Sequence, residues 1–234
     1  MGAFLHTFFS PFDFLRATPQ IWDGFKLNLK LMFVAEALVL PLALLVAVVR
    51  GLPGRATAPL RAAAIAYTDI FRGTPLVLVL FIVLGFATLN YVGLSSETLF
   101  TNGLIALVLV YTAYVTEVYR AGIESVHPSQ RMAARSLGLS YLQALRYVVL
   151  PQAIRRVVPP LLNDFIGLQK DTALVTIIGL VEATAQANQY ASDWANFTGL
   201  TVAAVFFIIL TIPFARFTDH IIKQREQRER AQAV

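Results

Sequence analysis

The sequence predicts an all-α membrane protein with five transmembrane helices, a cytoplasmic insert, an N-terminus outside and a C-terminus in the cytoplasm. Three observations lead to this fold class. Apolar residues make up 57% of the chain and charged residues only 14%, against roughly 25% charged residues in soluble domains. The apolar residues are gathered in blocks about as long as the ~20 residues that a spanning helix needs. Lysine and arginine are concentrated in alternate connecting segments, which sets the orientation.

The chain divides into three regions. Residues 1–24 are rich in phenylalanine but interrupted by Pro11 and Pro19, so we expect a retained, interfacial segment on the periplasmic side. Residues 25–222 form the expected transmembrane domain, and residues 223–234 form a charged cytoplasmic tail. The five expected spans are Phe25–Val49, Leu60–Phe86, Thr101–Tyr119, Val157–Val181 and Thr198–Ile222.

The connecting segments alternate in charge. The loop after the first span, the insert after the third and the tail after the fifth are rich in arginine, whereas the loops at residues 95–100 and 182–197 contain neither lysine nor arginine. The positive-inside rule therefore places the insert in the cytoplasm. Because the basic residues are split among separate segments and form no stripe with interleaved aromatic residues, we expect membrane lipid and no nucleic acid as a partner.

The insert, at about residues 124–151, interrupts the apolar pattern with the sequence RMAARSLGLS. Pro128 suits the first turn of a short helix, and Gly138 supplies a C-terminal stop. Ser140 can cap a second short helix, which we expect to end at Pro151. Such a cationic, partly apolar surface either lies on anionic lipid or binds another protein, and local sequence alone leaves both alternatives open.

Several kinds of chemistry are excluded by missing residues. The chain has no cysteine, and its three histidines lie far apart in sequence, which speaks against a metal site. None of its four lysines follows a glycine, so the Gly-Lys-Ser/Thr step of a phosphate-binding loop is missing. Neither His-Glu-x-x-His nor Gly-x-Ser-x-Gly occurs. We therefore expect neither an enzyme active site nor ATP hydrolysis in this chain.

Lys170 and Asp171 lie in the middle of the fourth expected span, where a charged residue costs about 2.5–3.5 kcal/mol on insertion scales. Adjacent residues point roughly 100° apart on a helix, so the two side chains cannot pair face to face. Each then needs a partner on another helix or on a ligand. An ion-pair lock between helices is the alternative to the ligand-binding role that we favour.

A second candidate is the stretch FRGTP, from Phe71 to Pro75. The apolar run that follows it, 75–89, reaches only about 22 Å as a helix against a 30 Å core, so we expect the helix to begin earlier and to draw Arg72 into the membrane. Gly73 and Pro75 weaken helical hydrogen bonding, as in the broken helices of transporters. The alternative is an ion pair between Asp69 and Arg72.

Glu117 is a weaker candidate. It lies near the cytoplasmic end of the third expected span, at helical spacing from Arg120 and Glu124. This spacing favours a solvated ladder of salt bridges over a binding role.

Four stretches carry a resemblance to a known family: QRMAARSLGLSYLQALRYVVLPQAIRRVVPPLLNDFI, DIFRGTPLVLVLF, TEVYRAGI and LQKDTALVTIIGLVE. From about Trp22 to the C-terminus, the chain resembles permease subunits of ATP-binding-cassette (ABC) importers, in the polar-amino-acid branch of the histidine/glutamine/arginine type. The resemblance implies the type I importer permease fold. It also implies that the insert is the coupling element on which an ATPase docks.

The resemblance assigns roles to individual residues. The implied ATPase-coupling residues are Met132, Ala133, Ala134, Arg135, Gly138, Leu139, Leu150 and Pro151. The implied substrate-binding residues are Arg72, Gly73, Thr74, Glu117, Lys170, Asp171 and Thr172. Met132 departs from the family, which has glutamate at this position. Because methionine forms no ion pair, we expect docking to depend on packing and on Arg131 or Arg135.

The resemblance also implies partners and a location. These are an ABC ATPase dimer that binds ATP and Mg²⁺, a periplasmic amino-acid-binding protein, a second permease subunit (identical or paralogous) and an amino-acid substrate. The chain itself is expected to need no cofactor and no metal, and to lie in the bacterial inner membrane. Alternating access driven by the ATPase is the implied mechanism. The alternative function is an ion-coupled secondary transporter or channel, in which the insert would have no purpose.

Overall fold

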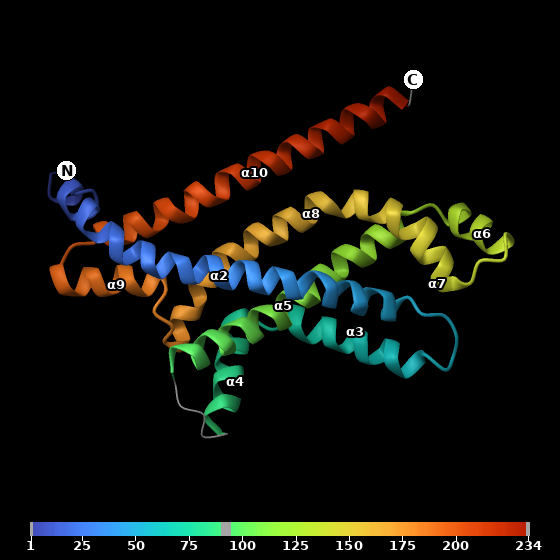
Figure 1. Cartoon of the computed structure of the whole chain (residues 1–234), viewed down its shortest axis with the longest axis horizontal. Helices are drawn as coiled ribbons and strands as arrows, with labels where there is room; N and C mark the ends of the chain where they lie inside the picture. Colours follow the sequence, from blue (N-terminus) through green and yellow to red (C-terminus); the bar gives the residue numbers. More distant parts are fainter. Residues whose placement is uncertain (1, 90–94, 233–234) are drawn as a thin grey trace. The chain divides into compact units, whose positions relative to one another are not determined.

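The computed structural model describes residues 2–89 and 95–232. All the regular secondary structure within these residues is helical (Figure 1). The helices are α1 (Gly2–Phe8), α2 (Pro11–Arg50), α3 (Ala58–Gly73), α4 (Leu76–Leu89), α5 (Ser96–Ser125), α6 (Pro128–Ser136), α7 (Tyr141–Ala144), the π-helical η1 (Leu145–Val149), α8 (Leu150–Asp171), the 3₁₀-helical η2 (Thr172–Ile178), α9 (Ala183–Trp194) and α10 (Thr198–Gln232). The chain forms two compact units. The first contains Met1–Ala37, Pro75–Val108 and Phe165–Phe217, and the second contains Leu38–Thr74, Leu109–Asp164 and Thr218–Val234.

The core of the first unit lies where the beginning of α2 packs against α9 and α10. Its buried residues are Ala17, Ile21, Phe25, Ala183, Ala187, Tyr190, Val202 and Ala203. Figure 1 shows α9 beside the first half of α2. The contact is close enough to require glycine at residue 24, because a Cβ there would lie 2.6 Å from the carbonyl carbon of Glu182. Small residues therefore bring these two helices into backbone contact.

The N-terminal segment is more helical than its prolines predicted. A break does precede Pro11, which occupies the first position of α2, but α2 then continues through Pro19 without interruption. The predicted break at Pro19 is wrong. Proline removes one backbone donor, and tertiary contacts hold the segment: the Phe197 amide donates to the Thr7 carbonyl at 2.9 Å, and the Thr201 hydroxyl donates to the Phe8 carbonyl at 2.7 Å.

Two of the expected spans are not continuous α-helices. The Leu60–Phe86 segment is broken between α3 and α4, where Thr74 is extended and Pro75 cannot donate a hydrogen bond. Our expectation of a helix running from before Arg72 into α4 is therefore wrong. The Val157–Val181 segment changes from α8 to the 3₁₀-helix η2 after Asp171.

Within the described residues, α2, α5 and α10 are long and apolar enough to cross a membrane, and the broken pair α3–α4 makes a fourth if it counts as one span. Helix α8 does not meet this criterion, because arginines and other polar side chains interrupt its 22 residues. The total of five spans remains a prediction.

Candidate functional site

The insert folds by local hydrogen bonds. Helix α6 begins at Pro128, as predicted, and the His127 ring accepts from the Ser129 amide at 3.2 Å. Gly138 follows α6 in the left-handed conformation, with φ +85°. Ser140 then caps α7 reciprocally with Gln143: the Gln143 amide donates to the Ser140 hydroxyl at 3.3 Å, and the Ser140 amide donates to the Gln143 side chain at 2.8 Å. The two predicted helices and their caps are confirmed.

The predicted end of the second helix is wrong. The chain passes from α7 through the π-helix η1 into α8, and Leu150 and Pro151 are the first two residues of α8. A π-helical turn is wider than an α-helical one, so the backbone donor that Pro151 lacks does not end the helix. The buried residues Leu145, Val149 and Ala153 form a small core with Val126, which follows α5. The insert is thereby anchored to the ends of α5 and α8.

The insert exposes several large apolar side chains. Leu137 is 83% exposed, Tyr147 63%, Met132 62% and Leu142 56%. Between residues 125 and 163 the sequence contains five arginines and no aspartate or glutamate. The exposed surface is thus apolar and cationic.

The remaining predicted coupling residues differ in their surroundings. Ala134 is buried, whereas Ala133 is exposed and Leu139 is half-buried. The Arg135 guanidinium donates to the Leu139 carbonyl at 2.8 Å and so closes the turn after α6. Arg131 is exposed. Of the two arginines proposed to replace the missing glutamate, Arg135 therefore already braces the insert itself.

A cluster of charges surrounds Glu117 in the second unit. Its carboxylate accepts hydrogen bonds from Arg50 and, at 2.6 Å, from Arg120 Nε, while Arg72 Nη1 lies 3.5 Å away. Arg120 also binds Glu124 at 2.6 Å. The predicted ladder is therefore present. It is not solvated around Glu117, whose side chain is only 15% exposed. Arg72 pairs with Glu117, whereas the sequence had offered Asp69 as its alternative partner.

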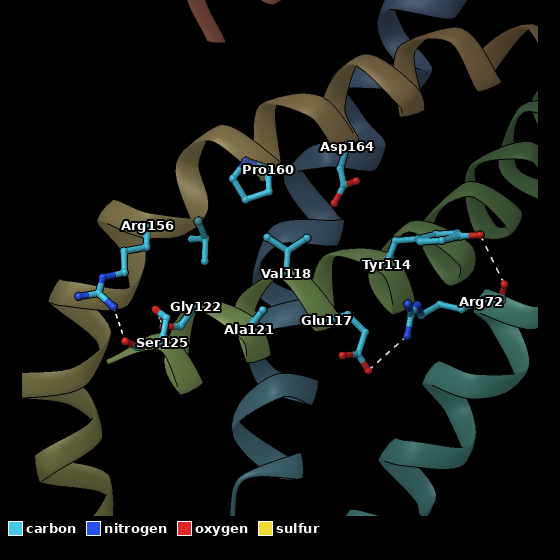
Figure 2. Close-up of a pocket in the computed structure, with 11 residues that line it drawn as sticks. Arg72, Tyr114, Glu117, Val118, Ala121, Gly122, Ser125, Arg156, Pro160 and Asp164 are labelled. Carbon is cyan, nitrogen blue, oxygen red and sulfur yellow. Dashed lines mark hydrogen bonds and ion pairs between the residues drawn. The ribbon is translucent and has the colours of Figure 1, made fainter. Parts of the chain in front are cut away.

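A cavity of about 470 Å³ adjoins this cluster (Figure 2). Its walls come from α5 and α8, with Arg72 from α3 reaching in at one end beside Tyr114 and Glu117. At the other end Arg156 donates to the Ser125 carbonyl. Asp164 and Pro160 project from α8 into the same space. The cavity therefore combines cations, carboxylates and apolar walls.

Lys170, Asp171 and Thr172 belong to the first unit. Lys170 and Asp171 are the last two residues of α8, and Thr172 is the first residue of the 3₁₀-helix η2, so the three lie where the expected span changes its helix type. The Thr172 hydroxyl donates to the Gln169 carbonyl at 2.7 Å, a local bond of the kind that competes with α-helical bonding. Thr172 also accepts from the Asn28 amide group at 3.1 Å. This junction is where α8 gives way to the tighter η2.

Asn28 and Glu182 extend this network, and sequence reasoning missed both. The Asn28 side chain donates to Glu182 at 2.9 Å, and the Glu182 carboxylate also accepts from the Thr184 and Ala185 amides at the start of α9. Glu182 is fully buried, and burial raises the pKa of its carboxyl above the usual value, although these donors oppose the shift. A lone asparagine in an apolar span was the available signal.

The structure thus brings some of the predicted substrate-binding residues together and separates others by unit. Arg72 and Glu117 line one cavity of the second unit. Gly73 ends α3 in open space, and the Thr74 hydroxyl donates to the Ile70 carbonyl at 2.8 Å. Arg50 and Asp164 are further polar members of the second unit that the sequence motifs did not single out. Among the described residues, no group of three or more His, Cys, Asp or Glu side chains could hold a metal ion.

Comparison with known proteins adds evidence that the geometry alone lacks. Residues 40–227 match the family described as binding-protein-dependent transport system inner membrane component. The chain belongs to this family. Its members include ABC permeases that resemble the chain over most of its length, so the predicted resemblance is confirmed.

Three relatives illustrate the match. A probable glutamine ABC transporter permease protein of Bacillus subtilis (strain 168) is 33% identical over 210 residues, which cover 88% of this chain and 93% of the relative. An arginine transport system permease protein of the same organism is 33% identical over 204 residues, covering 86% and 91%. A crystal structure of an amino acid ABC transporter with histidines superposes with a TM-score of 0.80 at 31% identity, covering 91% of this chain and 97% of that one. The all-helical membrane fold of type I ABC permeases is therefore confirmed.

Proposed function

We propose that the chain is the permease subunit of an ABC importer for polar or charged amino acids, and that a separate ATPase drives it through the insert. A second permease subunit, identical or paralogous, completes the translocation path in the bacterial inner membrane. A periplasmic binding protein delivers the amino acid. ATP and Mg²⁺ bind to the ATPase dimer, and this chain supplies the path and the coupling surface.

The exposed apolar side chains of the insert are the observation that carries this proposal. Leu137, Tyr147 and Met132 remain exposed although the insert is folded, capped and anchored by its own core. Exposed apolar groups on an ordered element are typical of protein–protein contact surfaces. Because the charged residues of the insert that follow Glu124 are all arginines, the complementary partner surface has an apolar groove with carboxylates at its rim.

The connection of the insert to α5 and α8 supports a mechanical role. The core around Val126 and Val149 joins the beginning and the end of the insert, so a displacement of α6 and α7 pulls on both long helices. Closure of the ATPase dimer then drives the paired permeases between inward-open and outward-open states, which is alternating access. Residues 133, 134, 138 and 139 shape the surface that receives this displacement.

The substrate's charges explain the polar residues assigned to binding. An amino acid carries an ammonium and a carboxylate, and both groups need replacement partners when they leave water. In this proposal Lys170, Asp171 and Thr172 receive the substrate in the first unit, and Arg72 with its neighbours Gly73 and Thr74 binds it in the second. The names of the relatives, glutamine and arginine permeases, support a polar or charged substrate.

Reconstitution tests the proposal. The chain is placed in proteoliposomes with its partner ATPase and binding protein, and ATP-dependent uptake is measured for labelled L-glutamine, L-arginine and L-histidine. Leu137→Asp should abolish both ATPase binding and uptake, because a carboxylate would be buried in the apolar contact. Leu137→Met keeps the apolar surface and should retain both. Uptake that needs an ion gradient and no ATP, or a Leu137→Asp variant that binds the ATPase normally, would refute the proposal.

A further inference from the structure

The cavity of the second unit has an uneven distribution of charge. Arg50 and Arg120 make close ion pairs with Glu117, whereas Arg72 lies 3.5 Å from the same carboxylate and its side chain is 42% exposed. Glu117 and Glu124 supply two carboxylates to the three guanidinium groups of this cluster, so one positive charge is left over. Arg72 is the most loosely held of the three arginines and faces the cavity (Figure 2).

An unsatisfied acceptor lies on the opposite helix. Asp164 lines the cavity from α8, and its Oδ2 atom is buried without a hydrogen-bond partner among the described residues. A buried carboxylate oxygen without a donor is destabilising because it loses its hydration and gains no hydrogen bond in return. For this reason such groups are nearly always hydrogen-bonded in native structures. Pro160, one turn earlier on α8, has no backbone N–H to offer. Among the described residues, the Asp164 Oδ2 atom therefore has no cationic or N–H donor.

The rest of the cavity suits a small organic molecule. Tyr114, Val118 and Ala121 form an apolar and aromatic wall between the charged groups. The volume of about 470 Å³ lies within the ~300–1,000 Å³ typical of small-molecule sites, which also combine apolar walls with a few polar anchors.

We propose that this cavity is a second amino-acid-binding subsite, in which Arg72 binds the α-carboxylate and Asp164 binds the α-ammonium. A zwitterion satisfies both ends at once, whereas an anion leaves the Asp164 oxygen without a donor and a cation leaves Arg72 in excess. A bound carboxylate competes with Glu117 for Arg72, so occupancy loosens the Arg72–Glu117 pair. The inference rests on the proposed function, and the subsite shares no residue with Lys170, Asp171 or Thr172.

The absence of cysteine from the chain gives a direct test. Ala121→Cys places a single thiol on the cavity wall, and its rate of reaction with N-ethylmaleimide is measured in the purified permease–ATPase complex. Each common L-amino acid is added in turn. Those that slow the reaction are compared with their decarboxylated amines and their N-acetyl derivatives. Ser192→Cys, an exposed position on α9, provides the control thiol.

We expect at least one L-amino acid to slow the reaction at Ala121→Cys several-fold without slowing it at Ser192→Cys. Its decarboxylated amine and its N-acetyl derivative should protect far less, because each lacks one of the two charges. Arg72→Gln or Asp164→Asn should raise the amino-acid concentration that gives half-maximal protection by about tenfold or more, as expected for loss of a charged hydrogen bond. The matched surface changes Arg55→Gln and Asp193→Asn should leave it unchanged.

Three outcomes would overturn the inference: no amino acid protects, the singly charged derivatives protect equally well, or protection survives both Arg72→Gln and Asp164→Asn. Complex formation with the ATPase and the melting temperature show whether each variant is folded. A variant that fails to fold is replaced by Arg72→Lys or Asp164→Glu. These variants keep the charge, so the amino acid should protect their thiol at lower concentrations than in the neutral variants. ATP-driven uptake by the unmodified chain without any protection would refute the subsite and the binding role of Arg72, and would leave the proposed permease and coupling functions standing.

Discussion

At the scale of single residues, Gly24 determines how closely α2 approaches α9. A Cβ at this position would lie 2.6–2.8 Å from backbone atoms of Glu182 and Ala183, which cannot move away as a flexible side chain could. The same contact lets Asn28, one turn further along α2, donate to Glu182 and accept from the Ala183 amide at 3.1 Å. The close approach that Gly24 permits therefore also brings Asn28 within hydrogen-bonding distance of Glu182 and Ala183.

We predict that Gly24→Ala destabilises the protein. Alanine favours a helix over glycine by about 1 kcal/mol, but overpacking against fixed backbone typically costs about 1–3 kcal/mol, and here it also separates Asn28 from Glu182. The melting temperature in detergent should fall. Gly85→Ala in α4 is the matched control, because no atom lies within 4 Å of its added Cβ. An unchanged melting temperature for Gly24→Ala would show that the contact is looser than described.

The charged residues around Glu117 show which ion pairs can be predicted from sequence spacing and which cannot. The spacing of Glu117, Arg120 and Glu124 predicted their ladder, because residues three and four apart are neighbours on any helix. It could not predict Arg50 or Arg72 as partners, since these come from other helices. Burial of the Glu117 side chain follows from that tertiary packing, and so the expectation of a solvated ladder failed.

At the scale of elements, the insert shows which structures local sequence determines. Pro128, Gly138 and Ser140 act on their own turns of chain, and each acts as predicted. Pro151 did not, because the π-helical turn before it absorbs the missing donor. The change from α8 to η2 was not predicted either. Thr172, where it begins, bonds locally to the Gln169 carbonyl and also to Asn28, 144 positions away, and only the local bond lies within reach of sequence reasoning.

We predict that Gly138→Val weakens coupling while Gly138→Asn preserves it. The position has φ +85° and no neighbouring atom within 4 Å, so the cost is purely one of backbone conformation. A β-branched residue is strongly disfavoured there, by about 1–2 kcal/mol, whereas asparagine tolerates the left-handed region. ATPase binding to the purified permease, measured by co-elution, distinguishes the two. Equal binding by both variants would mean that this turn does not shape the docking surface.

At the scale of the whole molecule, sequence patterns gave the class of fold and the family, and the alternation of basic segments gave an orientation. They overstated the regularity of the spans, because mean apolarity does not register the break at Thr74 and Pro75 or the charges of α8. Five crossings nevertheless remain the number that puts all arginine-rich connections on one side.

Single cysteines test this topology. We predict that Ser192→Cys reacts with a membrane-impermeant maleimide in intact spheroplasts, whereas Ser136→Cys on α6 reacts only after lysis. Both serines are exposed, and the unmodified chain has no cysteine to contribute background. Labelling of both positions from the same side would contradict an odd number of crossings between the residue 182–197 loop and the insert.

The grouping around Glu117 makes some inherited substitutions far more damaging than others. If one guanidinium is lost, the acid keeps the remaining ones as counter-ions and the interior stays close to neutral. If the acid itself is lost, Arg120 keeps Glu124, but Arg50 is left with a largely buried positive charge and without its carboxylate partner. Over generations of drift, the acidic position is therefore the least replaceable member of the group.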